Sequence, residues 1–318
     1  MAACRMSEIL HHHTPVLLNE TVQNLIVSPQ GTYIDATFGR GSHSRAILDR
    51  LNAQGRLIAF DKDPEAVAYA KQYFTDSRFT IVQRSFAHMQ QYLQEQNLIG
   101  SVHGVLFDLG VSSPQLDNPE RGFSFARDGK LDMRMDTTQG IDASTWLAEV
   151  DEEELANVLW QYGEEKFSRR IARAIVTTRS ETPIQTTAQL ADLIVRAMPK
   201  MKGKWEKHPA TRSFQAIRIA INQELTELQQ ALDQALTILM IGGRLLAISF
   251  HSLEDRIVKQ FIKQHEKGEE LPRGLPVKGS VFNAKLKALG KPIKPGLQEI
   301  HQNPRARSAI LRIAEKLS

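Results

Sequence analysis

The sequence predicts an α/β protein with a Rossmann-like, doubly wound sheet and an inserted all-helical subdomain. Three observations support this prediction. Short apolar runs alternate with helical segments up to residue 108, the pattern from 142 to 199 is purely helical, and mixed strand and helix signals return after 213. Strands separated by single helices form parallel βαβ units, and a purely helical interruption is therefore interpreted as an insertion.

The first third of the chain supplies four expected strands, at residues 32–37, 56–61, 79–83 and 102–108. Three of these strands end at or beside an acidic residue. Between them the periodicity indicates helices at 43–52, 64–74 and 87–97. In parallel sheets, ligands bind beyond the carboxyl ends of the strands, so these acidic residues are candidate site residues.

The rest of the chain sets the expected domain boundaries. Residues 110–136 are rich in Gly, Pro, Ser and Asp, and such a long connection is usually functional. We expect the sheet domain to comprise 11–136 and 213–318, with a helical, substrate-recognising insertion at 137–212. Within its second part we expect one long helix (213–239) ending at Gly242-Gly243, a strand (244–250), a helix (252–266), a loop (268–304) and a last strand (306–314).

Composition excludes several classes of protein. The 318 residues are 42% hydrophobic and 24% charged, as in ordinary globular domains. Cys4 is the only cysteine, which excludes a disulfide framework and a thiolate metal site. We find no apolar run of membrane-spanning length and no signal-peptide core, so we expect a cytoplasmic protein without a membrane partner. His11, His12 and His13 lack clustered carboxylate partners, and we expect no metal.

A glycine-rich loop follows the first expected strand. Residues 39–44 (GRGSHS) approximate G-x-G-x-x-G, with serine in the third glycine position, and Asp61 ends the next strand twenty residues after Gly41. In this context the loop can hold an adenosine cofactor, whose ribose hydroxyls donate hydrogen bonds to the carboxylate. The alternative is a tight turn with a solvent-facing Asp61.

The first strand discriminates between two cofactors. Asp35 precedes the loop, where its carboxylate would repel a pyrophosphate but tolerate the ammonium and sulfonium of S-adenosylmethionine. Ser42 and His43 open the helix, whose free N–H groups suit a ligand carboxylate, although His43 could simply cap the helix. Phe86, after the third strand, could cover an adenine or belong to the core.

Asp108 ends the fourth strand, where the chemistry is expected. A carboxylate there can accept N–H bonds from an exocyclic base amine and offset the positive charge that develops during methylation. The Pro-Pro-aromatic sequence that often follows such an acid in amino-methyltransferases is missing, so the alternative of a capping aspartate stays open. Phe123 and Phe125 could stack on a splayed-out base or anchor the loop.

Two further stretches are candidate site segments. Residues 200–212 contain four lysines and Arg212 against the single acid Glu206, with Trp205 among them. This combination suits RNA phosphates and base stacking through Lys202, Lys204, Trp205, Lys207 and Arg212, but a solvated loop explains it equally well. Residues 248–256 (ISFHSLEDR) place His251, Ser252, Glu254 and Asp255 after a strand, where they could face the same cleft or cap the next helix.

Seven stretches occur in the order typical of a known family. They are HTPVLLNE (13–20), YIDATFGRGSHS (33–44), FDLGVSSPQLD (107–117), RGFSF with LDMRMD (121–136), HPATRSFQAIRIAINQEL (208–225), SFHSLEDRIVK (249–259) and NPRARSAILR (303–312). With them the chain resembles, essentially end to end, the MraW (RsmH) family of bacterial 16S ribosomal RNA cytosine-N4 methyltransferases.

The resemblance implies a class I methyltransferase fold with a helical insertion and S-adenosylmethionine as donor. It also implies, as acceptor, the N4 of a cytidine in the decoding region (P-site) of 16S rRNA within the 30S subunit, rather than DNA or adenine N6. By motif, the donor-binding residues would be Gly41, Ser42, His43, Asp61, Phe86, Asp108 and Gln115, with Asp108 also catalytic. Ser42 stands where the family usually has a glycine.

Two other functions are compatible with parts of the sequence. The glycine loop would also suit a nicotinamide-dependent oxidoreductase, which Asp35 and the family resemblance oppose. The basic stretch 200–212 would suit an RNA-binding assembly factor without catalytic activity. A monomer and a homodimer are both compatible with the sequence.

Overall fold

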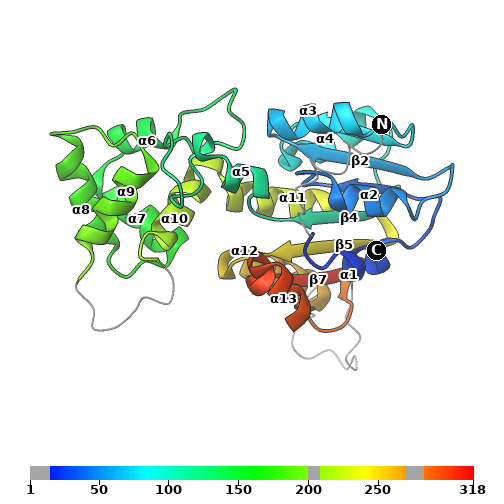
Figure 1. Cartoon of the computed structure of the whole chain (residues 1–318). Coiled ribbons are helices and arrows are strands. Elements are labelled where there is room, and N and C mark those ends of the chain that lie inside the picture. The colour runs from blue at the N-terminus through cyan, green and yellow to red at the C-terminus, as the bar shows by residue number, and fades with distance from the viewer. Residues whose placement is uncertain (1–14, 200–207, 269–282) are drawn as a thin grey trace, which may run out of the picture. The chain divides into compact units, whose positions relative to one another are not determined.

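The computed structural model describes residues 15–199, 208–268 and 283–318, and the chain divides into two compact units (Figure 1). We call them the sheet unit, Met1–Gly110 with Thr226–Ser318, and the helical unit, Val111–Leu225. The expected insertion 137–212 lies within the helical unit, which additionally takes in residues 111–136 and 213–225. Among the described residues, no helix has the length and apolarity needed to span a membrane.

The sheet unit contains a seven-stranded sheet with the order β3-β2-β1-β4-β5-β7-β6. The first five strands pair in parallel, whereas β7 is antiparallel to both β5 and β6. The strands are β1 (Thr32–Asp35), β2 (Arg56–Asp61), β3 (Phe79–Gln83), β4 (Val102–Asp108), β5 (Leu239–Ser249), β6 (Leu286–Ala288) and β7 (Ile310–Lys316). The sequence predictions for β2, β3 and β4 are confirmed residue for residue.

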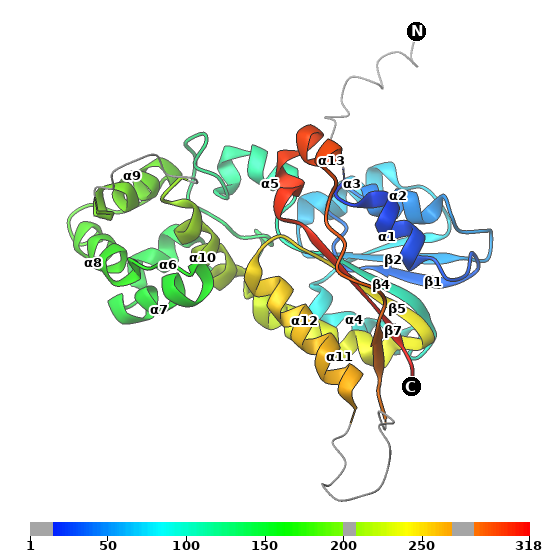
Figure 2. The same ribbon diagram turned by 90° about the horizontal axis from the view of Figure 1, so that it is seen from below.

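Helices cover both faces of this sheet (Figure 2). Apolar residues of α1 (Leu18–Leu25), α2 (Ser42–Leu48) and the 3₁₀ turn η3 (Pro304–Ser308) join the core on one face, and the short α13 (Leu297–Gln302) precedes η3. On the other face lie α4 (Met89–Glu95), which follows the 3₁₀ turn η1 (Phe86–His88), α11 (Glu224–Ile238) and α12 (Ser252–Lys267). Burial on both faces explains why the central strands are continuous apolar runs.

Local signals explain the position of α3 (Pro64–Tyr73). The carboxylate of Asp63 accepts a hydrogen bond from the Glu65 N–H at 2.9 Å, and Pro64 occupies the first turn, where no N–H is needed. Ala66 and Ala70 are buried in a small cluster with Phe38. The helix therefore begins at the residue that immediately follows its cap.

The helical unit has its own apolar core. Its elements are α5 (Ser113–Asp117), the 3₁₀ turn η2 (Pro119–Arg121), α6 (Ala143–Glu149), α7 (Glu152–Gly163), α8 (Ser168–Arg179), α9 (Thr187–Ala197) and α10 (Thr211–Asn222). Thr186 caps α9 in a capping box with Gln189.

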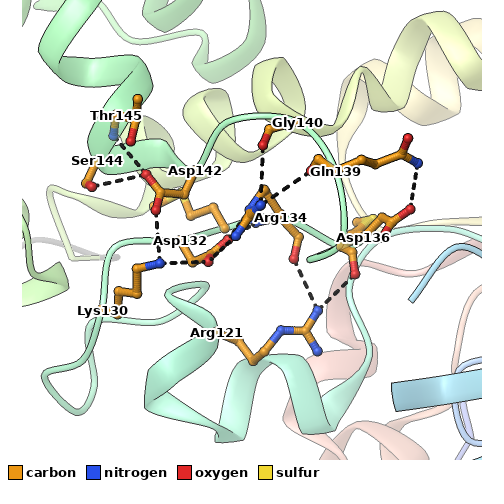
Figure 3. Close-up of polar contacts among 12 residues, drawn as sticks. Arg121, Lys130, Asp132, Arg134, Asp136, Gln139, Gly140, Asp142, Ser144 and Thr145 are labelled. Carbon is orange, nitrogen blue, oxygen red and sulfur yellow. Dashed lines mark hydrogen bonds and ion pairs between the residues drawn. The ribbon is translucent and has the colours of Figure 1, made fainter. Parts of the chain in front are cut away.

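A charged network orders the connection between η2 and α6 (Figure 3). Arg134 forms a bidentate pair with the buried Asp132, at 2.8 and 2.9 Å. Lys130 lies 3.3 Å from Asp132 and 3.0 Å from Asp142, whose carboxylate also accepts the Thr145 N–H at the start of α6. These pairs hold a segment that has few apolar side chains of its own.

Three expectations about the second part of the chain are wrong. The single helix expected at 213–239 is interrupted at Gln223, which has φ 52° and separates α10 from α11. Glutamine carries no sequence signal for this left-handed conformation, which is more usual for glycine. Gly242 and Gly243 do not end a helix but lie within β5, and the expected loop 268–304 contains β6 and α13.

The central strand β4 provides a test of the core. Leu106 is completely buried there, so Leu106→Ala should lower the free energy of unfolding by about 2–5 kcal/mol. The matched variant Leu297→Ala, at a leucine that is 88% exposed, should change it by less than about 0.5 kcal/mol. Denaturant titration of both proteins checks this; equal losses would contradict the assignment of β4 to the core.

Candidate active site

Three carboxylates end three neighbouring strands. Asp61, Asp35 and Asp108 are the last residues of β2, β1 and β4, which lie side by side in that order. Asp35 pairs in register with Ala59 and Leu106, so the other two carboxylates lie two residues farther along their strands. Parallel strands bring their carboxyl ends to one edge, and the acidic residues predicted as site residues are therefore brought together.

The glycine loop lies at the same edge. Gly39 and Gly41 have φ values of 56° and 72°, a conformation that glycine adopts without strain. A Cβ atom on Gly41 would overlap the rings of Phe38 and Phe74, which form the floor of the loop. Gly41 therefore allows both the turn into α2 and the close approach of the backbone to those rings.

Asp61 is bound to this loop. Its carboxylate accepts hydrogen bonds from the Gly39 N–H at 2.8 Å and from the Asp63 N–H at 2.9 Å. Loss of hydration raises the pKa of Asp61 to about 6, although these two hydrogen bonds act in the opposite direction. The nearby carboxylates of Asp63 and Asp35 contribute to the increase. The Asp61 carboxylate is consequently less stable than an exposed one, and a ligand that donates further hydrogen bonds would stabilise it.

His43 and Asp108 form a pair. The His43 Nδ1 lies 3.3 Å from Asp108 Oδ2, and its Nε2 lies 3.2 Å from the carbonyl oxygen of Val16. Burial alone would lower the pKa of His43, but the hydrogen bond with Asp108 and the charges of Asp108 and Asp35 raise it above its usual value. Asp108 Oδ1 is buried and has no hydrogen-bond partner among the described residues.

Asp35 is the third carboxylate of the edge. It is 1% exposed and accepts hydrogen bonds from the Ser44 hydroxyl at 2.6 Å and the Thr37 N–H at 3.2 Å. Burial raises its pKa. Thr37 also links Asp35 to Asp108, because its hydroxyl oxygen accepts a hydrogen bond from the Asp108 N–H at 2.7 Å.

The remaining residues that are predicted to bind the methyl donor lie in different surroundings. Ser42 is the first residue of α2 and is half-buried. Phe86 packs edge-on against Phe107 with ring centroids 5.7 Å apart and is also half-buried, so it belongs to the core while keeping an accessible part. Gln115, in the helical unit, is 6% exposed, and its side-chain oxygen accepts the Ser112 N–H in the capping box of α5.

The predicted RNA-contacting residues differ in accessibility. Phe123 is only 7% exposed and lies in the core of the helical unit, so it anchors the loop and presents no stacking face. Phe125 is half-buried and stacks on His208, with ring centroids 4.6 Å apart. Arg212 is exposed, and its guanidinium donates to the Glu164 carbonyl at 3.2 Å. Lys202, Lys204, Trp205 and Lys207 lie outside the described residues.

Residues 248–256 serve the fold. His251 and Glu254 form the capping box of α12, and Asp255 forms a bidentate pair with Arg312 at 2.7 and 3.0 Å. The capping alternative therefore holds for this segment.

Within the described ranges, no group of three or more His, Cys, Asp or Glu side chains could hold a metal ion. His11, His12 and His13 precede the first described residue.

Several residues of the site were missed by sequence reasoning. The Val16 carbonyl, the Thr37 and Ser44 hydroxyls and the rings of Phe38 and Phe74 all contact the site. Thr37, Phe38 and Ser44 stand within or beside the glycine loop, so their position was a usable signal. Val16 and Phe74 are distant in sequence, and only the tertiary structure brings them there.

The sheet order, the glycine loop and the acidic strand ends together define a class I methyltransferase fold with a helical insertion. The chain belongs to the MraW methylase family, whose profile matches residues 10–317. It is 55% identical to ribosomal RNA small subunit methyltransferase H of Shewanella loihica, over 96% of this chain and 97% of that protein. The protein of the same name from Coxiella burnetii is 53% identical, over 96% and 99%. An rRNA methylase of Streptococcus thermophilus superposes with a TM-score of 0.41 at 12% identity, covering 95% and 94%.

Gly41 offers a test of the loop. Gly41→Ala should reduce the free energy of unfolding by about 1–3 kcal/mol more than Gly140→Ala, because only the first variant also overlaps rigid rings. Gly140 is a matched control, since it has the same φ of 72° but nothing lies within 4 Å of an added Cβ. Thermal or denaturant unfolding measures both, and an equal loss would show that the rings do not form the floor.

Proposed function

We propose that this protein transfers a methyl group from S-adenosylmethionine to the N4 of a cytidine in the decoding region of 16S rRNA, within the small ribosomal subunit. Membership in the MraW methylase family and the two relatives that are named small subunit rRNA methyltransferases support the reaction class and the RNA. The observation that carries the proposal is Asp108, whose buried Oδ1 has no hydrogen-bond partner among the described residues.

The described residues fit such a donor. When bound, S-adenosylmethionine supplies an electrophilic methyl group on a positively charged sulfur. Asp35, Asp61 and Asp108 gather at one edge, and His43 is the one cationic side chain among the described residues that is paired with them there. A positively charged ligand offsets this concentration of negative charge. The Asp61 carboxylate can accept the ribose hydroxyls, as acids at this position of the second strand commonly do.

The acceptor chemistry assigns Asp108 its role. The lone pair of the cytosine amine is delocalised into the ring, so this nitrogen is a weak nucleophile. A carboxylate that accepts an amine N–H favours a tetrahedral nitrogen and stabilises the positive charge that develops as the new N–C bond forms. One proton then leaves the amine. The orphaned Oδ1 of Asp108 is an acceptor suited to this N–H.

The remaining assignments are proposals of the same kind. Donor contacts are assigned to Gly41, Ser42, His43, Asp61, Phe86, Asp108 and Gln115. RNA contacts are assigned to Phe125, Arg212, Lys202, Lys204, Trp205 and Lys207, and the expected insertion 137–212 would recognise the RNA. The protein would act in the cytoplasm, on the small subunit or its rRNA.

The test is methyl transfer from labelled S-adenosylmethionine to 30S subunits that lack the modification, and to deproteinised 16S rRNA, followed by digestion to nucleosides. Labelled N4-methylcytidine is expected. A protein that binds subunits and donor but labels no nucleoside would instead be an RNA-binding factor. Binding of NADH without binding of S-adenosylmethionine would instead support the alternative function of a nicotinamide-dependent oxidoreductase.

Asp61 predicts a pH dependence of donor binding. Its carboxyl group ionises with a pKa of about 6, and the ionised form accepts ribose hydroxyls more strongly. Donor affinity should therefore decrease as the pH falls through about 6. Asp61→Asn should bind about 10- to 100-fold more weakly at neutral pH and lose this dependence. Calorimetric titration over a pH series measures both effects.

The matched control for Asp61 is Asp76→Asn. Asp76 is paired with Arg78, which holds its pKa at about 2, well below the range of the titration. This variant should keep the wild-type affinity and its pH dependence. If Asp61→Asn bound the donor with wild-type affinity, the assignment of Asp61 to the donor site would be wrong.

Asp108 predicts a loss of turnover. Asp108→Asn keeps the shape of the side chain but removes the negative charge, so turnover in the methyl-transfer assay should fall by roughly 10². Asp233→Asn, at an exposed residue of α11, is the control and should retain wild-type turnover. Wild-type turnover in the Asp108 variant would mean that this carboxylate takes no part in the reaction.

A further inference from the structure

The imidazole ring of His43 lies between two hydrogen-bond acceptors. Its Nε2 is 3.2 Å from the Val16 carbonyl oxygen, and its Nδ1 is 3.3 Å from Asp108 Oδ2. The residue is 5% exposed, so water cannot readily replace either partner. This geometry restricts the protonation state of the ring.

Counting protons identifies that state. A carbonyl oxygen and an ionised carboxylate only accept hydrogen bonds, whereas a neutral imidazole has a single N–H to donate. Both contacts of His43 are therefore satisfied only when both ring nitrogens carry a proton. In the alternative, a neutral ring beside a protonated Asp108, the Nδ1 of His43 would carry no proton, and the ¹⁵N titration described below distinguishes the two states.

His103 shows the contrasting arrangement in the same unit. This residue of β4 accepts the Thr32 N–H at its Nδ1, at 3.2 Å, so that nitrogen carries no proton. The contacts of His43 thus require a proton on both ring nitrogens. The contact of His103 excludes a proton on its Nδ1. The pair provides an internal comparison.

The charges around His43 favour the cation. Among the described residues, the charged groups that act on the ring are Asp108, at the end of β4, and Asp35, at the end of β1. From the described residues before α1, the ring is contacted by the Val16 carbonyl. Both carboxylates raise the pKa of His43 and outweigh the opposing effect of burial. The cation is therefore stabilised up to a pH above the usual value, and it is lost as the pH rises through the raised pKa.

We propose that His43 is a positioning residue that, as a buried imidazolium, fixes Asp108 through Oδ2 and leaves Oδ1 as the acceptor for the cytosine amine. The positioning role rests on the proposed function; the charge state does not. The Val16 carbonyl orients the ring, and the ring orients the carboxylate. Such second contacts commonly fix the direction of a group that touches the substrate.

The first experiment tests the charge state directly. Full-length protein with ¹⁵N-labelled histidine is titrated by NMR, with assignment through His43→Gln and His103→Gln. At a pH just above the ordinary pKa of histidine, both ring nitrogens of His43 should still carry a proton, whereas the Nδ1 of His103, which accepts the Thr32 N–H, should carry none. A bare Nδ1 in His43 at this pH would overturn the proposal.

The second experiment tests the partner. In Asp108→Asn the amide cannot compensate the imidazolium, so His43 should titrate at a lower pH than in the wild type, whereas the His103 resonances should stay unchanged. An unchanged His43 titration would show that Asp108 does not stabilise the imidazolium, and it would overturn the proposal. Neither NMR experiment requires methyl transfer, so these results stand even if the proposed reaction fails.

The third experiment tests the positioning role. His43→Gln should keep the donor Kd within about threefold, because the backbone N–H groups remain, but should lower turnover by about 10- to 100-fold. Turnover of the wild type should decrease at alkaline pH as the imidazolium loses its proton, and this alkaline limb should be absent from the variant. His103→Gln should retain both turnover and the alkaline limb.

The kinetic outcomes separate positioning from mere stabilisation. A His43 variant with wild-type turnover, or one whose alkaline limb persists unchanged, would overturn the role. If His43→Gln is too unstable to assay, the alkaline limb of the wild type, compared with the NMR titration of His43, decides instead: coincident midpoints support the proposal and separate midpoints refute it.

Discussion

The parallel arrangement of β2, β1 and β4 is the constraint on which the site depends. It forces Asp61, Asp35 and Asp108 to the same edge of the sheet, where burial makes the negative charges of Asp35 and Asp61 costly. The protein compensates through a few short contacts: the Gly39 N–H on Asp61, the Ser44 hydroxyl on Asp35 and the His43 ring on Asp108. In the proposed function, the charge that these contacts leave uncompensated would be matched by a positively charged donor and by an amine that donates hydrogen bonds.

Much of this arrangement could be predicted from the sequence because it depends on local signals. Apolar runs bounded by acidic residues gave the bounds of β2, β3 and β4, and the glycine loop indicated the ligand edge. The residues that tune the site were less accessible to such reasoning. Val16 reaches His43 across 27 positions of the chain, and a backbone carbonyl leaves no trace in a sequence pattern.

Other features could not be predicted, for identifiable physical reasons. The interruption at Gln223 depends on a left-handed residue held beside Asn222, whose buried amide bonds the backbone of Met133 and Met135. Phe123 and Phe125 are two positions apart and look equivalent in sequence, but one is buried and the other half-exposed. Proximity in sequence does not determine which ring can meet a base; packing of the helical unit does.

The central claim is that the edge carboxylate Asp108 directs methylation to cytosine N4. The most direct measurement is mass spectrometry of 16S rRNA nucleosides from cells in which this chain is the only enzyme of its family. Cells with the wild-type chain should contain N4-methylated cytidine in the decoding region, and cells with Asp108→Asn, expressed at the same level, should lack it. Undiminished N4-methylation with the variant would contradict the account.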